Sequence, residues 1–204
     1  MDKIITISRQ YSSGGREIGR KLAEKWGIPF YDNELITRAA RESGYSVEVF
    51  ESAESRATSS LLYSIARGIT TSGGIGTTFQ NLSLDDRLFL AQADMIRKVA
   101  QEGPCVIVGR CADYVLRRFD NVVNIFVYAD MEFRKERAVR IDNMPTDRIE
   151  DNILKMDKRR ANYYNFHTGE KWGRTENYAL CINSSKIGTD NAVKVISEYI
   201  EAIN

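Results

Sequence analysis

Apolar residues follow two patterns along the chain, short unbroken runs and longer stretches with helical spacing. Ile4-Ile5-Thr6-Ile7 and Cys105-Val106-Ile107-Val108 are continuous apolar runs, which are typical of strands covered on both faces. After the first run, Ile18, Leu22 and Trp26 recur four positions apart, which predicts an amphipathic helix. The sequence therefore predicts strands that alternate with helices.

The same two patterns predict the remaining elements of the chain. Further strands are expected over residues 28–31, 122–127 and 178–182. Helices are expected from the first glycine pair to Gly27, and then over about 32–40, 84–103, 130–140, 146–166 and 192–203. Asp32 and Asp130 precede two of these helices and are expected to cap them. Such alternation predicts a mostly parallel, doubly wound sheet with helices on both faces.

The segment from 43 to 81 does not follow either pattern. It is rich in Ser, Thr and Gly, and Gly73-Gly74-Ile75-Gly76 is its least regular point. We expect this segment to form a mobile flap over a site, with a short helix around Leu61 to Ala66. The chain of 204 residues then fits one α/β domain with such an insertion.

Composition excludes several classes of protein. With 29 basic and 28 acidic residues the net charge is +1, which argues against a dedicated nucleic-acid binder. No apolar run approaches the length of a membrane span, and Met1-Asp2-Lys3 leads directly into a strand, so we expect a cytoplasmic protein without a secretory leader. The three cysteines are widely spaced and suggest neither a disulfide framework nor a zinc site. His167 is the only histidine, which nearly excludes triad chemistry and multi-histidine metal sites.

A glycine-containing turn follows the first predicted strand, at the position of the phosphate-binding loop of nucleotide kinases. Small residues at Ser12, Ser13, Gly14 and Gly15 let a ligand approach the backbone, and the helix that follows directs N–H groups at an anion. The Walker pattern GxxxxGK[ST] is not met, because the lysine is missing. Arg16 could supply the missing charge. A strand–helix turn with solvated arginines is the alternative.

Polar and basic residues follow other predicted strands at their carboxyl ends. Asp32, Arg110 and Asn183-Ser184 occupy such positions. Ligands of parallel α/β sheets bind beyond these ends, and a basic residue there often meets an anionic ligand. We therefore expect Arg110 to bind a ligand rather than to form a structural ion pair. Arg38, two helical turns beyond Asp32, is not singled out by its position alone.

The predicted helix 146–166 carries a cluster of charged and aromatic residues. Asp157-Lys158-Arg159-Arg160 precedes Tyr163-Tyr164, so that each arginine faces one tyrosine and Asp157 can pair with Arg160. An arginine pair that closes over a nucleotide would neutralise charge during phosphoryl transfer. A solvated, salt-bridged helix is the alternative, and it is favoured when this segment is considered by itself.

Taken together, these segments resemble cytidylate kinase, and more closely the cytidylate-kinase-like proteins of bacteria. The resemblance covers nearly the whole chain and is weakest over 43–81. ITISRQYSSGGREIGRKLA is similar to the strand, phosphate loop and first helix of that family. YDNELITR resembles its LDSGAIYR segment, VGR resembles its DGRD segment, and DKRRANYY resembles the arginine helix of its lid.

The resemblance implies a P-loop kinase fold. This fold is a three-layer α/β/α sandwich with a five-stranded parallel sheet, here formed as a single domain over 1–204. Residues from about 43 to 81 would form the acceptor-binding flap, and residues from about 143 to 175 a helical lid. Small-molecule nucleotides would be the partners, with neither nucleic acid nor a membrane, and a homo-oligomer is left open.

The resemblance also implies roles for individual residues. Phosphate binding would fall to Ser12, Ser13, Gly14, Gly15 and Glu17, acceptor binding to Asp32, Asn33, Arg38 and Arg110, and catalysis to Arg16, Arg159 and Arg160. ATP with Mg²⁺ would be the phosphate donor. The family's loop lysine falls on Gly15, and its hydroxyl residue near magnesium falls on Glu17. Val108 and Cys111 replace the aspartates that flank GR in the family, one of which helps position the cytidine nucleotide.

The expected function is therefore transfer of the ATP γ-phosphoryl group to a nucleoside monophosphate, CMP or dCMP. Such catalysis consists mainly of positioning and charge neutralisation, for which a cluster of arginines is adequate. A monophosphate acceptor is already anionic and needs no general base. Two alternatives stay open: a nucleotide-binding regulatory protein without transferase activity, which the missing lysine favours, and a kinase for another small metabolite.

Overall fold

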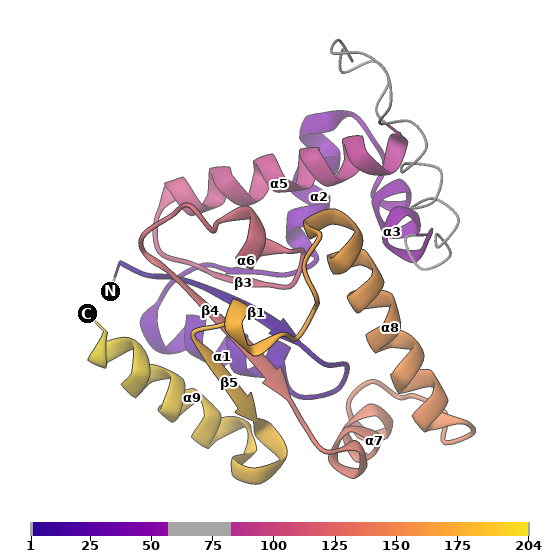
Figure 1. The fold of residues 1–204 in the computed structure, drawn as a ribbon, viewed down its shortest axis with the longest axis vertical. Helices are drawn as coiled ribbons and strands as arrows, with labels where there is room; N and C mark the ends of the chain where they lie inside the picture. The colour runs from indigo at the N-terminus through magenta and orange to yellow at the C-terminus, as the bar shows by residue number, and fades with distance from the viewer. Residues whose placement is uncertain (1, 57–82, 204) are drawn as a thin grey trace.

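A parallel sheet forms the centre of the protein. The computed structural model describes residues 2–56 and 83–203, and its five strands lie in the order β2-β3-β1-β4-β5 (Figure 1). The strands are β1 (Ile4–Arg9), β2 (Phe30–Tyr31), β3 (Val106–Val108), β4 (Val122–Tyr128) and β5 (Leu180–Asn183). All four pairings between neighbouring strands are parallel. The expected five-stranded parallel sheet is confirmed.

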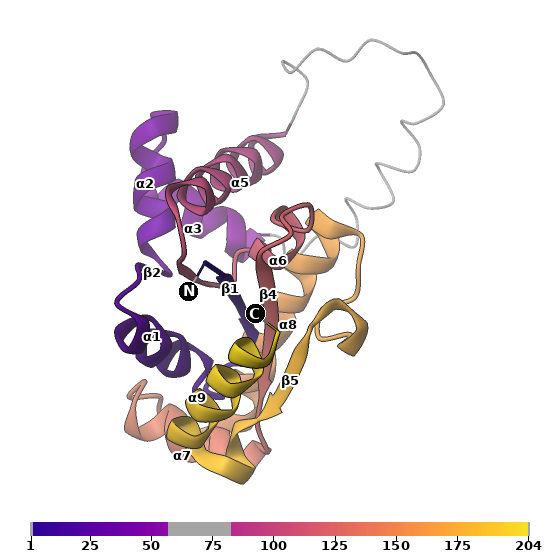
Figure 2. The ribbon, with the colours of Figure 1, turned by 90° about the vertical axis from the view of Figure 1, so that its left-hand side faces the viewer.

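Helices cover both faces of this sheet and complete three layers (Figures 1 and 2). The elements other than strands are α1 (Gly15–Trp26), α2 (Glu34–Ser43), α3 (Val47–Arg56), α5 (Leu84–Glu102), α6 (Ala112–Val115), α7 (Met131–Arg140), α8 (Ile149–Thr168), the 3₁₀ turn η2 (Thr175–Asn177) and α9 (Ser184–Ala202). One core cluster joins the sheet to α1 and α9, and the other joins it to α2, α3, α5 and α6. This arrangement is the expected α/β/α sandwich.

The central strand β1 shows why the apolar run predicts its position. Ile5 and Ile7 are fully buried among residues of α1 and α9, whereas Ile4 belongs to the cluster on the opposite face. Successive side chains of a strand point to opposite faces, so a strand between two helical layers must be apolar at every position that packs. The strand ends at Arg9, where the polar loop begins.

Several predicted boundaries differ from those in the structure. Asn33 rather than Asp32 precedes α2, and neither Asn33 nor Asp130 caps its helix through a side-chain hydrogen bond. The lid helix begins at Ile149 rather than at residue 146, and the last strand begins at Leu180 after the 3₁₀ turn. The elements are thus those expected, but Asp32 and Asp130 form ion pairs instead of capping helices.

The segment expected to form a flap is described only at its start. Val47 to Arg56 form the helix α3, in which Phe50 is buried in the cluster under α2 and α5. The predicted helix at 61–66 and the glycine cluster at 73–76 lie outside the described residues. Among the residues that are described, none of the helices is both long and apolar enough to cross a membrane.

A buried carboxyl group on α6 accepts a hydrogen bond from α8 and so joins the two helices. The Tyr164 hydroxyl on α8 donates a 2.9 Å hydrogen bond to Asp113 Oδ2 on α6, and Asp113 is 3% exposed. Burial raises the pKa of Asp113 to about 6, although this hydrogen bond acts in the opposite direction. Asp113 in the folded protein therefore retains its proton over a pH range in which the unfolded chain has lost it.

We expect the Asp113 carboxyl to make the protein less stable as pH rises from about 4 to about 6, because the native state binds more protons than the unfolded state in that interval. Asp113→Asn should remove a decline of about 3 kcal/mol in the free energy of unfolding across this range. Urea unfolding at a series of pH values measures it. The exposed Asp120→Asn is the control, and equal pH slopes in the two variants would contradict the prediction.

Candidate active site

Two cavities meet at the carboxyl edge of the sheet. The first, called the loop cavity, measures about 400 Å³ and is lined by residues 9–17 with Asp32, Arg137 and Arg160 among others. The second, called the arginine cavity, measures about 360 Å³ and contains Arg110, Arg159 and several aromatic side chains. Arg9, Asn33 and Arg160 line both cavities. This is the edge at which parallel α/β sheets bind their ligands.

The loop between β1 and α1 is tightly packed against its surroundings. Gly14 has φ +84°, and a Cβ there would lie 2.8 Å from Thr189 Cγ2. A Cβ on Gly15 would lie 2.7 Å from Arg9 Cβ. The loop is also held by the Ser184 hydroxyl, which donates a 2.6 Å hydrogen bond to the Ser13 carbonyl. Both positions therefore require glycine, because neighbouring side chains lie too close for a Cβ. The loop leads into the N-terminus of a three-turn helix, which is a favourable place for an anion.

Glu17 on α1 is neutralised by cations rather than open to a metal. Its carboxylate oxygens accept hydrogen bonds of 2.7 Å from Lys21 and Arg137 and of 2.8 Å from Thr189. Burial alone would raise the pKa of Glu17, but these three donors outweigh it and lower the pKa to about 2. The described residues contain no cluster of three metal-ligating side chains. Glu17 thus positions Arg137 beside the loop.

Arg137 is a site residue that the sequence did not single out. Its side chain is 9% exposed, and its guanidinium carbon lies 3.5 Å from the position that a Cβ on Gly14 would occupy. Its Nε is buried and has no hydrogen-bond partner among the described residues. A buried donor without a partner costs free energy, so this Nε at the loop cavity is suited to an anionic ligand.

Arg16, the expected substitute for the loop lysine, is turned toward Asp32. Its Nε lies 2.6 Å from Asp32 Oδ2, and its side chain is 58% exposed. Both residues line the loop cavity, so the structure does bring them together. The charge of Arg16 is, however, already paired with a carboxylate that is 8% exposed.

Helix α8 is docked on the loop through Asp157. Its carboxylate accepts a 2.6 Å hydrogen bond from the Tyr11 backbone N–H and pairs with Arg134, which in turn donates to the Tyr11 carbonyl at 2.8 Å. The expected pairing of Asp157 with Arg160 is wrong, because the Asp157 carboxylate forms its ion pair with Arg134. Arg160 instead donates a 3.1 Å hydrogen bond to the Arg9 carbonyl.

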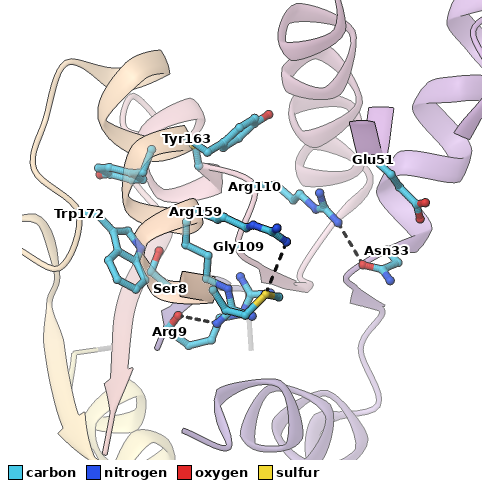
Figure 3. A pocket seen from close by; sticks show the side chains of 13 residues that line it. Ser8, Arg9, Asn33, Glu51, Gly109, Arg110, Arg159, Tyr163 and Trp172 are labelled. Carbon is cyan, nitrogen blue, oxygen red and sulfur yellow. Dashed lines mark hydrogen bonds between the residues drawn. The ribbon is translucent and has the colours of Figure 1, made fainter. Parts of the chain in front are cut away.

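The arginine cavity brings together Asn33, Arg110 and Arg159 (Figure 3). Arg110 Nη2 donates a 3.0 Å hydrogen bond to Asn33 Oδ1, and Arg159 contacts the Met156 sulfur at 3.8 Å. Figure 3 shows Tyr163 and Trp172 along the same wall, which gives the cavity flat apolar surfaces beside its cations.

Of the expected acceptor-binding residues, Arg38 is the one that the structure places elsewhere. It borders neither cavity; its guanidinium lies 3.4 Å from the Tyr31 hydroxyl and 3.8 Å from Glu102. Asn33 and Arg110, by contrast, line the arginine cavity, whereas Asp32 lines only the loop cavity.

Arginines outnumber carboxylates among the residues that line the two cavities. Burial, and after it the charge of Arg9, lowers the pKa of Arg160 to about 9. Burial likewise lowers the pKa of Arg9 and of Arg110. Guanidinium groups whose charged form is disfavoured gain stability from an anion, so these shifts favour a polyanionic ligand.

The fold and this site define the class of the protein. The five-stranded parallel sheet with helices on both faces is the α/β fold of the P-loop kinases. The structure resembles that of shikimate kinase from Bacteroides thetaiotaomicron, with 13% identity over 98% of this chain and 99% of that one and a TM-score of 0.53. It also resembles a gluconokinase from Sinorhizobium meliloti, with 14% identity over 99% and 95% of the two chains and a TM-score of 0.51.

The sequence assigns the family within this class. The model of the cytidylate kinase-like family matches residues 4–186, and the chain therefore belongs to that family. An uncharacterized protein from Eubacterium ventriosum has a similar structure, with 27% identity over 98% of each chain and a TM-score of 0.72. None of the curated proteins matches this chain.

We expect Asp157→Asn to release α8 from the loop. Removing one partner of a buried ion pair costs roughly 3–5 kcal/mol, and Asp157 is 13% exposed while Arg134 is 3% exposed. The melting temperature should fall, and the Tyr11 amide should exchange its hydrogen at least roughly tenfold faster, because its acceptor is weakened.

Hydrogen exchange resolved to the loop peptide measures this effect. Asp151→Asn is the matched control, since Asp151 lies on the same helix and is exposed. Equal exchange at Tyr11 in the two variants would show that Asp157 does not hold the lid on the loop.

Proposed function

We propose that this protein transfers the γ-phosphoryl group of ATP to a nucleoside monophosphate, CMP or dCMP. The observation that carries the proposal is the junction of the two cavities, where Arg9, Asn33 and Arg160 form a shared wall. A kinase needs a donor and an acceptor site that meet at one point, and cations at that point. Membership of the cytidylate kinase-like family supports the same class of reaction.

The loop cavity suits the donor triphosphate. Ser12, Gly14 and Gly15 line it at the N-terminus of α1, where backbone N–H groups can meet a phosphate, whereas the Ser13 N–H already donates to the Gln10 carbonyl. Arg137 adds an unsatisfied buried donor. Mg²⁺ would arrive with ATP and neutralise phosphate charge. Glu17, whose two oxygens are engaged by three donors, is a poor ligand for it. The other carboxylates of this cavity are Asp32, which is paired with Arg16, and Asp142.

The arginine cavity suits the acceptor. Arg110 and Asn33 would bind the acceptor phosphate, Arg159 and Arg160 would neutralise charge on the migrating group, and Tyr163 offers a surface on which a base can stack. Residues 143–175 would then act as a lid and residues 43–81 as an acceptor-binding flap, within one domain over 1–204. In this proposal Arg38 has no direct contact with the acceptor.

Two other functions are supported by specific features. A regulator that binds nucleotides without transfer is favoured by the absence of the Walker lysine and by the paired state of Arg16. A kinase for another small metabolite is favoured by the shared fold with shikimate kinase and gluconokinase. A hydroxyl acceptor would need a carboxylate base, for which Asp32 lies at the loop cavity.

An assay of ADP release with a panel of acceptors separates these functions. CMP, dCMP, UMP and AMP would test nucleotide acceptors, and shikimate and gluconate would test hydroxyl acceptors. Turnover that is highest with CMP or dCMP supports the proposal. ATP binding without turnover of any acceptor would favour the regulator, and turnover with the hydroxyl compounds alone would favour the metabolite kinase.

We expect Arg110→Met to raise KM for the acceptor roughly 10- to 100-fold, since hydrogen bonds to charged groups contribute about 1.5–3 kcal/mol. KM for ATP should change little, because Arg110 lines the arginine cavity and not the loop cavity. Steady-state kinetics with the best acceptor measures both constants. The exposed Arg118→Met is the matched control, and an unchanged acceptor KM in Arg110→Met would remove Arg110 from the acceptor site.

A further inference from the structure

Arg9, the last residue of β1, occupies an unusual position. It belongs to the sheet rather than to the glycine turn, and its side chain is 19% exposed. It lines the loop cavity and the arginine cavity alike. Figure 3 shows it at the end of its strand beside Gly109, where a Cβ on Gly109 would overlap the Arg9 guanidinium.

The stem of Arg9 fills the space that a side chain at residue 15 would need. A Cβ on Gly15 would lie 2.7 Å from Arg9 Cβ and 3.1 Å from Arg9 Cγ. A Walker loop places its lysine at the start of the helix, which is where this chain has Gly15. The side chain of Arg9 can take this position only because residue 15 is a glycine. The positive charge beside the loop therefore comes from the last residue of the strand and not from the first turn of the helix.

The charge of Arg9 is only weakly compensated. Asp32 is the one carboxylate among the described residues within 4 Å of its guanidinium, at 3.9 Å from Nη2. The same carboxylate lies 2.6 Å from Arg16 Nε, which already balances it. A buried cation without a close counter-ion is costly unless a ligand supplies the negative charge.

The guanidinium of a second arginine is hydrogen-bonded to the backbone of Arg9. Arg160, on the lid helix, donates its hydrogen bond to the Arg9 carbonyl and lines both cavities as Arg9 does. Burial and the charge of Arg9 both lower the pKa of Arg160, so the two groups repel each other in the absence of an anion. The lid and the strand therefore bring two cations to the boundary between the cavities.

The geometry points to Arg9 as the catalytic cation of the donor site, in the role that a lysine fills in a Walker loop, with Arg160 as its partner. This inference rests on the proposed phosphoryl transfer. An oxygen of the acceptor forms a bond to the γ-phosphorus of a nucleoside triphosphate while the bond to the β–γ bridging oxygen breaks, and that oxygen keeps the electron pair on the departing diphosphate. A monophosphate acceptor is anionic and releases no proton. Arg9 and Arg160 neutralise the charge on the group in transit.

The test compares Arg9→Met with Arg16→Met and with Arg140→Met, an exposed control on α7 that borders neither cavity. Sodium tripolyphosphate and ATP are the probes, read by thermal shift and calorimetry, and kcat is measured with the best acceptor. Arg9→Met should weaken both probes at least roughly tenfold and lower kcat by about 10²–10³-fold. The losses in Arg16→Met should be smaller, and Arg140→Met should behave as the wild type.

The melting temperature without ligand separates a catalytic from a structural role. Replacing an undercompensated buried cation by Met should leave it unchanged or raise it, whereas a structural ion pair with Asp32 would make it fall. Arg9→Lys, which keeps the charge, should retain part of the phosphate binding and of kcat. It replaces Arg9→Met in the comparison if Arg9→Met does not fold.

Each outcome decides one of the two claims. Tripolyphosphate binding and kcat in Arg9→Met equal to those of Arg140→Met would overturn the inference while the transfer reaction stands. A larger loss in Arg16→Met than in Arg9→Met would also overturn it. If the wild type turns over no acceptor, the proposed function fails, and the binding comparison still decides whether Arg9 holds the donor phosphates.

Discussion

The site depends on one electrostatic constraint, the gathering of partly buried guanidinium groups at the carboxyl edge of the sheet. Arg9, Arg110 and Arg160 come from three different elements, and burial lowers the pKa of each. Such groups repel one another and are costly to remove from water. The fold retains them where two cavities meet, and a polyanionic ligand at that boundary would relieve their repulsion.

Other charges of the protein serve to hold the elements around this cluster. Glu17 ties α1 to Arg137 on α7, and Asp157 ties α8 both to Arg134 and to the backbone of Tyr11. Each of these carboxylates pairs with an arginine next to the loop, and neither neutralises the arginines at the boundary between the cavities. The division explains how a chain with nearly equal numbers of basic and acidic residues builds a strongly positive cleft.

Much of the fold could be predicted from the sequence, because the signals are local. The apolar run at Ile4–Ile7 and the four-residue spacing from Ile18 to Trp26 report burial directly, and β1 and α1 follow them. The place of Arg110 after a buried strand predicts that it reaches this edge, where it lines a cavity, and the same signal applies to Arg9. Arg137 gave no local signal, since its partner Glu17 is 120 residues distant.

By itself, the sequence determined the order of strands and helices, the glycine turn and the family, because hydrophobic periodicity and motif spacing are properties of neighbouring residues. Only the tertiary structure decided which arginine meets which carboxylate. Arg16 and Arg9 lie seven residues apart and both carry one charge, but Asp32 pairs closely with Arg16 and leaves Arg9 to the cavities. That difference arises from side-chain packing between β1, Gly15 and Gly109, which brings together residues a hundred positions apart.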